Sequence, residues 1–152
     1  MTDVQAVNKA LAAEHAAVYA YGLMGARTTG DLRDKVTAAF DAHRARRDQL
    51  RALVSAAGGK PAEPEAAYTL TSVPGSAAAA VRLAVQVEAG ITAAYLELAA
   101  ASEPATRRLA ALAMQESAVR SYGFRPAVST AFPGMPPRAG APPATPAPTP
   151  SR

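Results

Sequence analysis

The stretch AAEHAAVYAY, residues 12–21, decides the fold because it places a carboxylate inside an otherwise apolar helical seam. Alanine favours helices, and the apolar residues around this stretch recur at steps of three and four, which predicts an amphipathic helix. Glu14 occupies a seam position that packing alone would assign to a leucine. A charge in a core is costly unless it is paired. The group that compensates Glu14 therefore decides what kind of site the protein contains.

A second copy of the same pattern follows 74 residues later. Such self-similarity at a fixed offset is typical of a duplicated structural unit. The sequence therefore predicts two copies of one helical hairpin, each with a glutamate in its seam. The matched residues are apolar, acidic, aromatic and basic in turn: Val7 and Val81, Glu14 and Glu88, Tyr21 and Tyr95, Arg46 and Arg120.

Four helical segments and one long connection predict the topology. The helices are expected at about residues 3–27, 28–57, 76–101 and 102–123, with Thr28 and Ser102 as caps. Two adjacent helices need only a short turn between them, whereas the third helix follows a long connection that contains three prolines. Extended, this connection reaches about 55 Å, more than the roughly 39 Å length of a 26-residue helix. We expect an all-α, ferritin-like four-helix bundle of two repeated hairpins joined by a long crossover.

The composition of the chain indicates which kinds of site, cellular compartment and partner to expect. The absence of cysteine excludes disulfides and thiolate metal sites and fits a reducing compartment, so we expect a cytoplasmic protein. Residues 1–10 carry an acid and no long apolar run, unlike a secretory signal. Arg82, Gln86 and Glu88 interrupt the longest apolar stretch, so no membrane-spanning segment is expected. The net charge of +4 permits contact with nucleic acid without arguing for it.

The C-terminal end differs in composition from the rest of the chain. Residues 133–152 hold eight of the thirteen prolines, and they contain no residues suited to a core. We therefore expect a bundle over residues 1–130 and a disordered tail, rich in proline and alanine, over residues 131–152.

Three polar side chains are expected at the same level halfway along the bundle, namely those of Glu14, His43 and Glu88. Di-iron sites of ferritin-like proteins are built at that level, from one Glu on each of two helices and a Glu-x-x-His pair on each of the other two. The two lone glutamates and one histidine of that pattern are present here. The sequence thus retains three of the six expected ligands.

The other three ligand positions hold different residues. Phe40 stands three residues before His43, where a Glu is needed, and Met114 and Ser117 replace the second Glu-x-x-His pair. Glu116 is a fourth candidate ligand, although the repeat places it one position away from the ligand station. Two glutamates and one histidine can hold one metal ion, but they poorly neutralise the two cations that activate oxygen.

Two strings of residues carry a family resemblance. Residues 12–22 contain the string EHAAVYAYG, and residues 42–51 are AHRARRDQLR. In these strings the chain resembles ferritin-like domain proteins, in particular an Ala-rich actinobacterial family of unknown function. The resemblance covers about residues 1–130 and implies the bundle without an established activity. It also implies that members with complete sites bind iron or manganese.

Several explanations of the buried glutamates remain open, and each implies a different function. Arg46 and Arg120 can form structural ion pairs with them, which would make the protein a degenerate, non-catalytic scaffold or interaction module without a cofactor. Alternatively, the two carboxylates can share a proton. The alternative to a scaffold or interaction module is a protein that binds iron or manganese, either an oxidoreductase or a metal-handling protein. Its candidate ligands are Glu14, His43, Glu88 and Glu116.

Other residues and partners are assigned more simply. Tyr21 and Tyr95 are expected to fill the core with a polar tip, and His15 to flank the seam. A third function is contact with nucleic acid through the basic second helix. We do not expect it, because no aromatic residues for base stacking are interleaved with the basic ones. The sequence leaves open a homodimer, the identity of any small-molecule substrate and whether the protein is an enzyme.

Overall fold

The computed structural model describes residues 1–71, 73–127 and 135. The described residues form four α-helices and no strand. The tail predicted for residues 131–152 lies outside the described residues, apart from Met135. The helices, in chain order, are α1 (Asp3–Gly25), α2 (Gly30–Ala56), α3 (Ala77–Leu98) and α4 (Pro104–Phe124).

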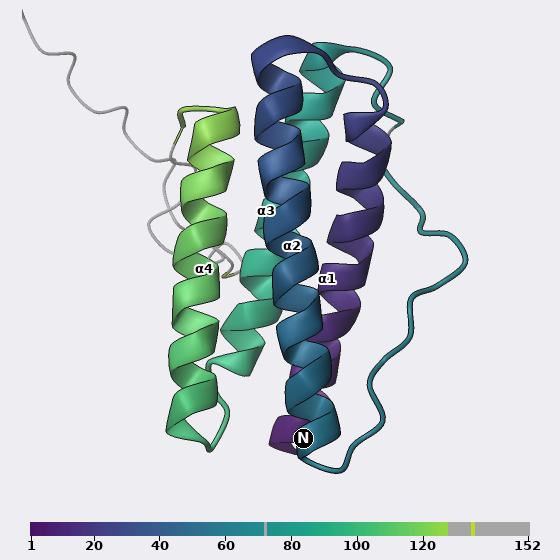
Figure 1. Ribbon diagram of the computed structural model, residues 1–152. Helices are drawn as coiled ribbons and strands as arrows, with labels where there is room; N and C mark the ends of the chain where they lie inside the picture. The colour runs from purple at the N-terminus through teal and green to yellow at the C-terminus, as the bar shows by residue number, and fades with distance from the viewer. Residues whose placement is uncertain (72, 128–134, 136–152) are drawn as a thin grey trace, which may run out of the picture.

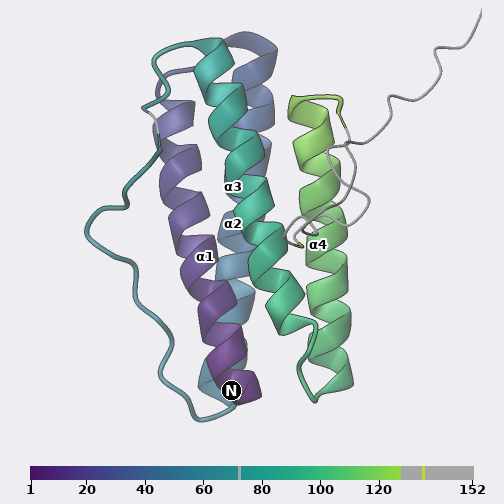
Figure 2. The same ribbon diagram turned by 180° about the vertical axis from the view of Figure 1, so that it is seen from behind.

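The helices pack as a four-helix bundle with one long crossover (Figure 1). Helix α1 packs against α2, α3 packs against α4, and the two hairpins meet between α1 and α3. The connection from α2 to α3 runs along the outside of the bundle, so α3 begins at the opposite end from the one where α2 finishes (Figure 2). This confirms the predicted all-α bundle of two hairpins, and it makes α1 and α3 antiparallel neighbours.

Local sequence signals explain where α1 and α3 begin. Thr2 forms a capping box with Gln5: its hydroxyl oxygen accepts from the Gln5 amide at 3.3 Å, and its own amide donates to Gln5 Oε1 at 2.8 Å. The hydroxyl oxygen of Ser76 accepts from the Ala79 amide at 3.1 Å. These bonds satisfy amide groups that have no partner within the helix.

The caps of α2 and α4 differ from the predicted ones by one residue. The N-caps are Thr29 and Glu103, because Thr28 and Ser102 have other partners. The Thr28 hydroxyl donates to the carbonyl of Met24 at 2.8 Å.

The start of α1 is bound to the turn between α3 and α4. The Asp3 carboxylate accepts from the amide and the hydroxyl of Ser102, at 2.9 and 2.7 Å, and from the amide of Glu103 at 3.0 Å. The hydrogen bonds from Ser102 and Glu103 hold the pKa of Asp3 below its ordinary value. Asp3 therefore connects the first hairpin to the second at one end of the bundle.

The core consists of two apolar clusters with a polar layer between them. Along α1, Leu11 belongs to one cluster and Met24 to the other; along α3, Leu83 and Ile91 belong to opposite clusters in the same way. Glu14 and Glu88 lie between these positions on their helices. Many of the buried residues are alanines, whose small side chains allow the helix backbones to approach closely. Each Å² of apolar surface that this packing removes from water stabilises the fold by about 25 cal/mol. They are Ala6, Ala10, Ala17, Ala20, Ala39, Ala79, Ala80, Ala84, Ala101, Ala110 and Ala113.

Helix α3 is the one described helix that is long and apolar enough by composition to cross a membrane, with a mean hydropathy of 1.3 over its most apolar 18 residues. The sequence-based prediction excluded such a segment because polar residues interrupt it. Core helices of bundles meet the same criterion. In this structure α3 packs between α1 and α4 and buries Glu88 at its centre.

Candidate functional site

His43 joins two carboxylates at the centre of the bundle. Its Nδ1 lies 2.7 Å from Glu14 Oε2, and its Nε2 lies 3.0 Å from Glu88 Oε1. The three residues come from α2, α1 and α3, and each is at most 1% exposed. The structure thus brings together three of the four candidate ligands that the sequence indicates.

The geometry favours a positive charge on the His43 ring. An ionised carboxylate only accepts hydrogen bonds, so an imidazole with a carboxylate oxygen at each nitrogen carries two N–H groups and a positive charge. Burial by itself lowers the pKa of His43, but the hydrogen bonds and negative charges of Glu14 and Glu88 outweigh it and raise this pKa above its ordinary value of 6.5. His43 is therefore an imidazolium shared by the two glutamates.

Two tyrosines complete the cluster in a crosswise arrangement. The Tyr21 hydroxyl on α1 donates to Glu88 Oε1 on α3 at 2.6 Å, and the Tyr95 hydroxyl on α3 donates to Glu14 Oε1 on α1 at 2.6 Å. Burial and the neighbouring carboxylates raise the pKa of both phenols far above the usual value, so both remain protonated donors. The Tyr21 ring also stacks on His43, with 5.2 Å between the ring centroids.

The crosswise pattern follows from the repeat and from helix direction. Each tyrosine lies seven residues, or about two helical turns, beyond the glutamate of its own helix. Because α1 and α3 run antiparallel, a side chain two turns along one helix approaches the glutamate of the other. The sequence-based assignment of Tyr21 and Tyr95 as core residues with a polar tip missed this pairing. The signal that could have found it is the repeated Glu-x₆-Tyr spacing.

Glu88 has more partners than Glu14. The Ser117 hydroxyl bonds Glu88 Oε2 and also its carbonyl, the latter at 3.0 Å, and Arg120 Nε donates to Glu88 Oε1 at 3.2 Å. Burial raises the pKa of Glu88, but the hydrogen bond and charge of His43, followed by Arg120 and Ser117, lower it below 4.5. Glu88 is therefore ionised. Across the described residues, no buried side-chain nitrogen or oxygen lacks a hydrogen-bond partner.

The repeat equivalent of Arg120 behaves differently. Arg46 donates to Glu116 Oε2 at 2.6 Å and to Gln49 Oε1 at 2.9 Å, and it forms no hydrogen bond or ion pair with Glu14. Glu116, predicted as a fourth ligand, is half exposed, because it lies one position along α4 from the inward-facing Ser117. The structure therefore places Glu116 in a surface ion pair outside the central cluster.

The side chains of this cluster do not fit a di-metal centre. No group of three or more histidine and acidic side chains within residues 1–71, 73–127 and 135 is arranged to hold a metal ion. Both His43 nitrogens already face carboxylates, whereas a metal ligand needs an unprotonated ring nitrogen. The Arg120 guanidinium also lies against Glu88, where it would repel a cation. Phe40 and Met114, at the positions of two missing ligands, pack against the apolar core instead.

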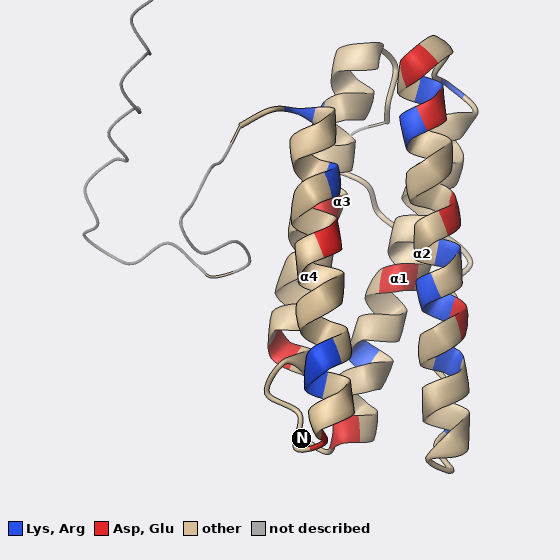
Figure 3. Cartoon of the chain, turned by 60° about the vertical axis from the view of Figure 1, so that its left-hand side comes forward, with Lys and Arg blue, Asp and Glu red and all other residues tan. Residues whose placement is uncertain are grey.

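The charged residues of α2 are mixed in sign. Lys and Arg are interspersed with Asp along the helix, as Figure 3 shows. Four of its arginines pair with acids at 2.6–3.9 Å, and the acids are Asp41, Glu116, Asp48 and Glu63. The positive charge of these α2 arginines is thus offset by neighbouring acids.

Comparison with known proteins identifies the family. Residues 6–137 match the family model described as a domain of unknown function, DUF4439. The chain belongs to the DUF4439 family. Its fold is similar to the crystal structure of a conserved hypothetical protein, rv2844, from Mycobacterium tuberculosis, with a TM-score of 0.78 and 34% sequence identity. That match covers 82% of this chain and 95% of the other.

The family description names no activity, and the similar crystal structure supports the fold alone. No curated protein matches the chain. The information on the chemistry of this DUF4439 domain therefore lies in its own central cluster.

Proposed function

We propose that this protein is a non-catalytic ferritin-like scaffold in which a hydrogen-bonded cluster replaces the metal site. The observation that carries the proposal is the position of His43, which directs one ring nitrogen at each buried glutamate. In a di-iron protein, the metal ions hold the facing glutamates together; here a protonated side chain does so.

The charges of the cluster balance without a metal ion. Glu14 and Glu88 contribute two negative charges, and His43 and Arg120 contribute two positive ones. Buried ions are tolerated only when they are paired and hydrogen-bonded, and this set is both. A divalent cation would have to displace the His43 protons and move Arg120 away from Glu88.

The crossover and the buried polar residues support the ferritin-like assignment. The bundle has one long crossover, and its seam glutamates lie on α1 and α3 with the histidine on α2, which is half of the ligand arrangement of ferritin-like di-iron proteins. The substitution of Phe40, Met114 and Ser117 at the remaining positions supports a site that has lost its metal function.

An exposed apolar face on α4 suggests that this scaffold binds a protein partner. Leu112, Val119 and Tyr122 are 47%, 66% and 54% exposed and lie on one side of the helix. We infer a second copy of this chain as the partner, because an antiparallel pair of α4 helices sets Leu112 of each chain against Val119 of the other. Sedimentation of the protein should show a dimer that Val119→Glu converts to a monomer; a wild-type monomer would contradict this.

Binding of iron or manganese by Glu14, His43 and Glu88 is the alternative function. It is favoured by the proximity of two carboxylates and one imidazole, which are ligand groups that iron and manganese accept. Glu116 could join them only by leaving Arg46.

Elemental analysis separates the two functions. Protein purified without chelators, and then incubated anaerobically with Fe²⁺ or Mn²⁺ and desalted, should retain far less than one ion per chain. The matched control is the double variant Glu14→Gln, Glu88→Gln, which keeps the shape of both side chains. Stoichiometric metal in the wild type that is lost in this variant would establish the alternative.

A further inference from the structure

A surface pocket lies between α1, α2 and the long connection, lined by residues outside the central cluster. It has a volume of about 470 Å³, which is within the range of small-molecule sites. Its walls carry aromatic groups (His15, Tyr19 and Tyr68), two cationic groups (Arg47 and Arg51) and two acidic groups (Asp48 and Glu65). None of these residues takes part in the proposed scaffold function.

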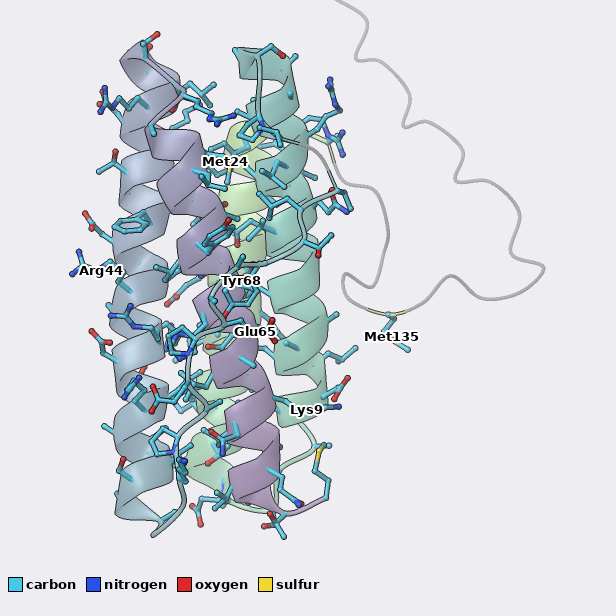
Figure 4. All side chains as sticks on the ribbon, turned by 90° about the vertical axis from the view of Figure 1, so that its right-hand side faces the viewer. Lys9, Met24, Arg44, Glu65, Tyr68 and Met135 are labelled. Atoms are coloured by element: carbon cyan, nitrogen blue, oxygen red, sulfur yellow. The ribbon has the colours of Figure 1, made fainter. Side chains whose placement is uncertain are left out.

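The aromatic wall is held in place by the connection. The Tyr68 and Tyr19 rings pack with 5.4 Å between their centroids, and the Tyr68 hydroxyl oxygen accepts a hydrogen bond from the amide of Glu65 at 2.9 Å. Figure 4 shows Tyr68 and Glu65 where the connection crosses α1. The wall that these rings form therefore exists before any ligand arrives.

Three hydrogen bonds fasten the same connection to α1. His15 Nε2 bonds the carbonyl of Ala62 at 3.0 Å, and Asn8 bonds both the Ala62 amide and the Lys60 carbonyl, at 2.8 and 2.9 Å. His15, which the sequence indicates only as a flanking residue, is thus a fixed side chain in the pocket wall. A preformed wall lowers the entropy lost when a ligand binds.

The cationic wall consists of two arginines one turn apart on α2. Arg47 pairs with Asp48 at 2.8 Å and Arg51 with Glu63 at 3.5 Å, and the side chains of both acids are more than 60% exposed. Ion pairs in solvent contribute little free energy, so either guanidinium can exchange its partner at small cost. A carboxylate or phosphate offers arginine a stronger, two-pronged hydrogen-bonding partner.

We propose that this pocket binds a small aromatic anion. The ring of the ligand packs against Tyr19 and Tyr68, and its carboxylate or phosphate group lies between Arg47 and Arg51. The pocket supplies both features within one cavity, and the aromatic rings favour a planar ligand over a flexible one.

Phenyl phosphate is the probe for this site, and its binding to the full chain can be followed through the NMR signals of the tyrosine rings. Inorganic phosphate tests the anion alone, phenol tests the ring alone, and benzoate tests the carboxylate. We expect phenyl phosphate or benzoate to shift the Tyr19 and Tyr68 signals saturably and to bind at least about tenfold more tightly than inorganic phosphate or phenol. Absence of saturable binding, or equal affinity for all four probes, would overturn the proposal.

A pair of variants tests the role of the arginines. The double variant Arg47→Gln, Arg51→Gln should weaken binding of the aromatic anions about tenfold or more, because it removes charge-assisted hydrogen bonds. The matched control is Arg44→Gln on the same helix; Arg44 stacks over Phe40 and projects away from Tyr68 (Figure 4). Thermal unfolding of each variant is the control for its folding. Unchanged affinity in the double variant, or an equal loss in Arg44→Gln, would contradict the proposed site.

Discussion

The hydroxyl of Tyr95 on α3 donates a hydrogen bond of 2.6 Å to Glu14 on α1, and this contact joins the two hairpins across the centre of the bundle. Its repeat equivalent, from Tyr21 to Glu88, has the same length and the opposite direction. Each hairpin therefore supplies the donor that stabilises the buried charge of the other. A duplicated sequence produces this reciprocity only if the equivalent helices are antiparallel.

Removing either tyrosine hydroxyl should destabilise the protein. Tyr95→Phe and Tyr21→Phe each leave the ring in the core but take one donor from a buried carboxylate, which we expect to lower the free energy of unfolding by about 1–3 kcal/mol. Urea unfolding monitored by circular dichroism measures the change. The control Tyr122→Phe alters an exposed ring and should change stability by less than about 0.5 kcal/mol. Equal effects at the three positions would argue against the crosswise pairing.

The two arginines related by the repeat should differ in their effect on stability. Arg120 pairs with the fully buried Glu88, so Arg120→Ala should lower the free energy of unfolding by about 1.5–3 kcal/mol. Arg46 pairs with the half-exposed Glu116, so Arg46→Ala should lower it by less than about 1 kcal/mol. The two variants can be compared in the same urea series. A larger loss of stability from Arg46→Ala than from Arg120→Ala would instead favour the sequence-based prediction, in which both arginines pair with the buried glutamates.

The central cluster should give the protein a stability maximum in mildly acidic solution. The folded pKa of His43 is raised above 6.5, so its contribution is complete below pH 6.5 and is lost as the pH rises through the folded pKa. The folded pKa of Glu88 is lowered below 4.5, so its contribution is complete above pH 4.5 and is lost as the pH falls through the folded pKa. Both contributions are therefore complete between pH 4.5 and 6.5.

A pH series of urea unfolding curves tests this profile. Wild-type stability should decline on both sides of the maximum, and His43→Gln should remove the decline on the alkaline side that belongs to the imidazolium. If the variant keeps the same alkaline decline as the wild type, His43 is not the titrating group.

The bundle could be predicted from the sequence because its signals are local or repetitive. Apolar spacing indicated the helices, and the length of the connection between α2 and α3 indicated the crossover. The meeting of Glu14, His43 and Glu88 followed from their positions near the helix centres. These inferences depend on backbone periodicity, which a single sequence expresses well.

The detailed partners could not be predicted in the same way. Whether Arg46 turns toward Glu14 or toward Glu116 depends on helix rotation and on solvent access, and the repeat gives no information on either. The caps at Thr29 and Glu103 moved by one residue because Thr28 and Ser102 satisfy a carbonyl and the Asp3 carboxylate, respectively. Such choices between competing hydrogen bonds are decided by tertiary packing.

The most direct measurement of the central claim is the protonation of the His43 ring, observed by ¹⁵N NMR between pH 4.5 and 6.5, before and after addition of Fe²⁺ or Mn²⁺. The proposed cluster predicts an N–H group at both ring nitrogens and no change when either metal is added. A ring nitrogen without a proton, together with signals around His43 that are broadened or shifted by stoichiometric metal, would contradict the account.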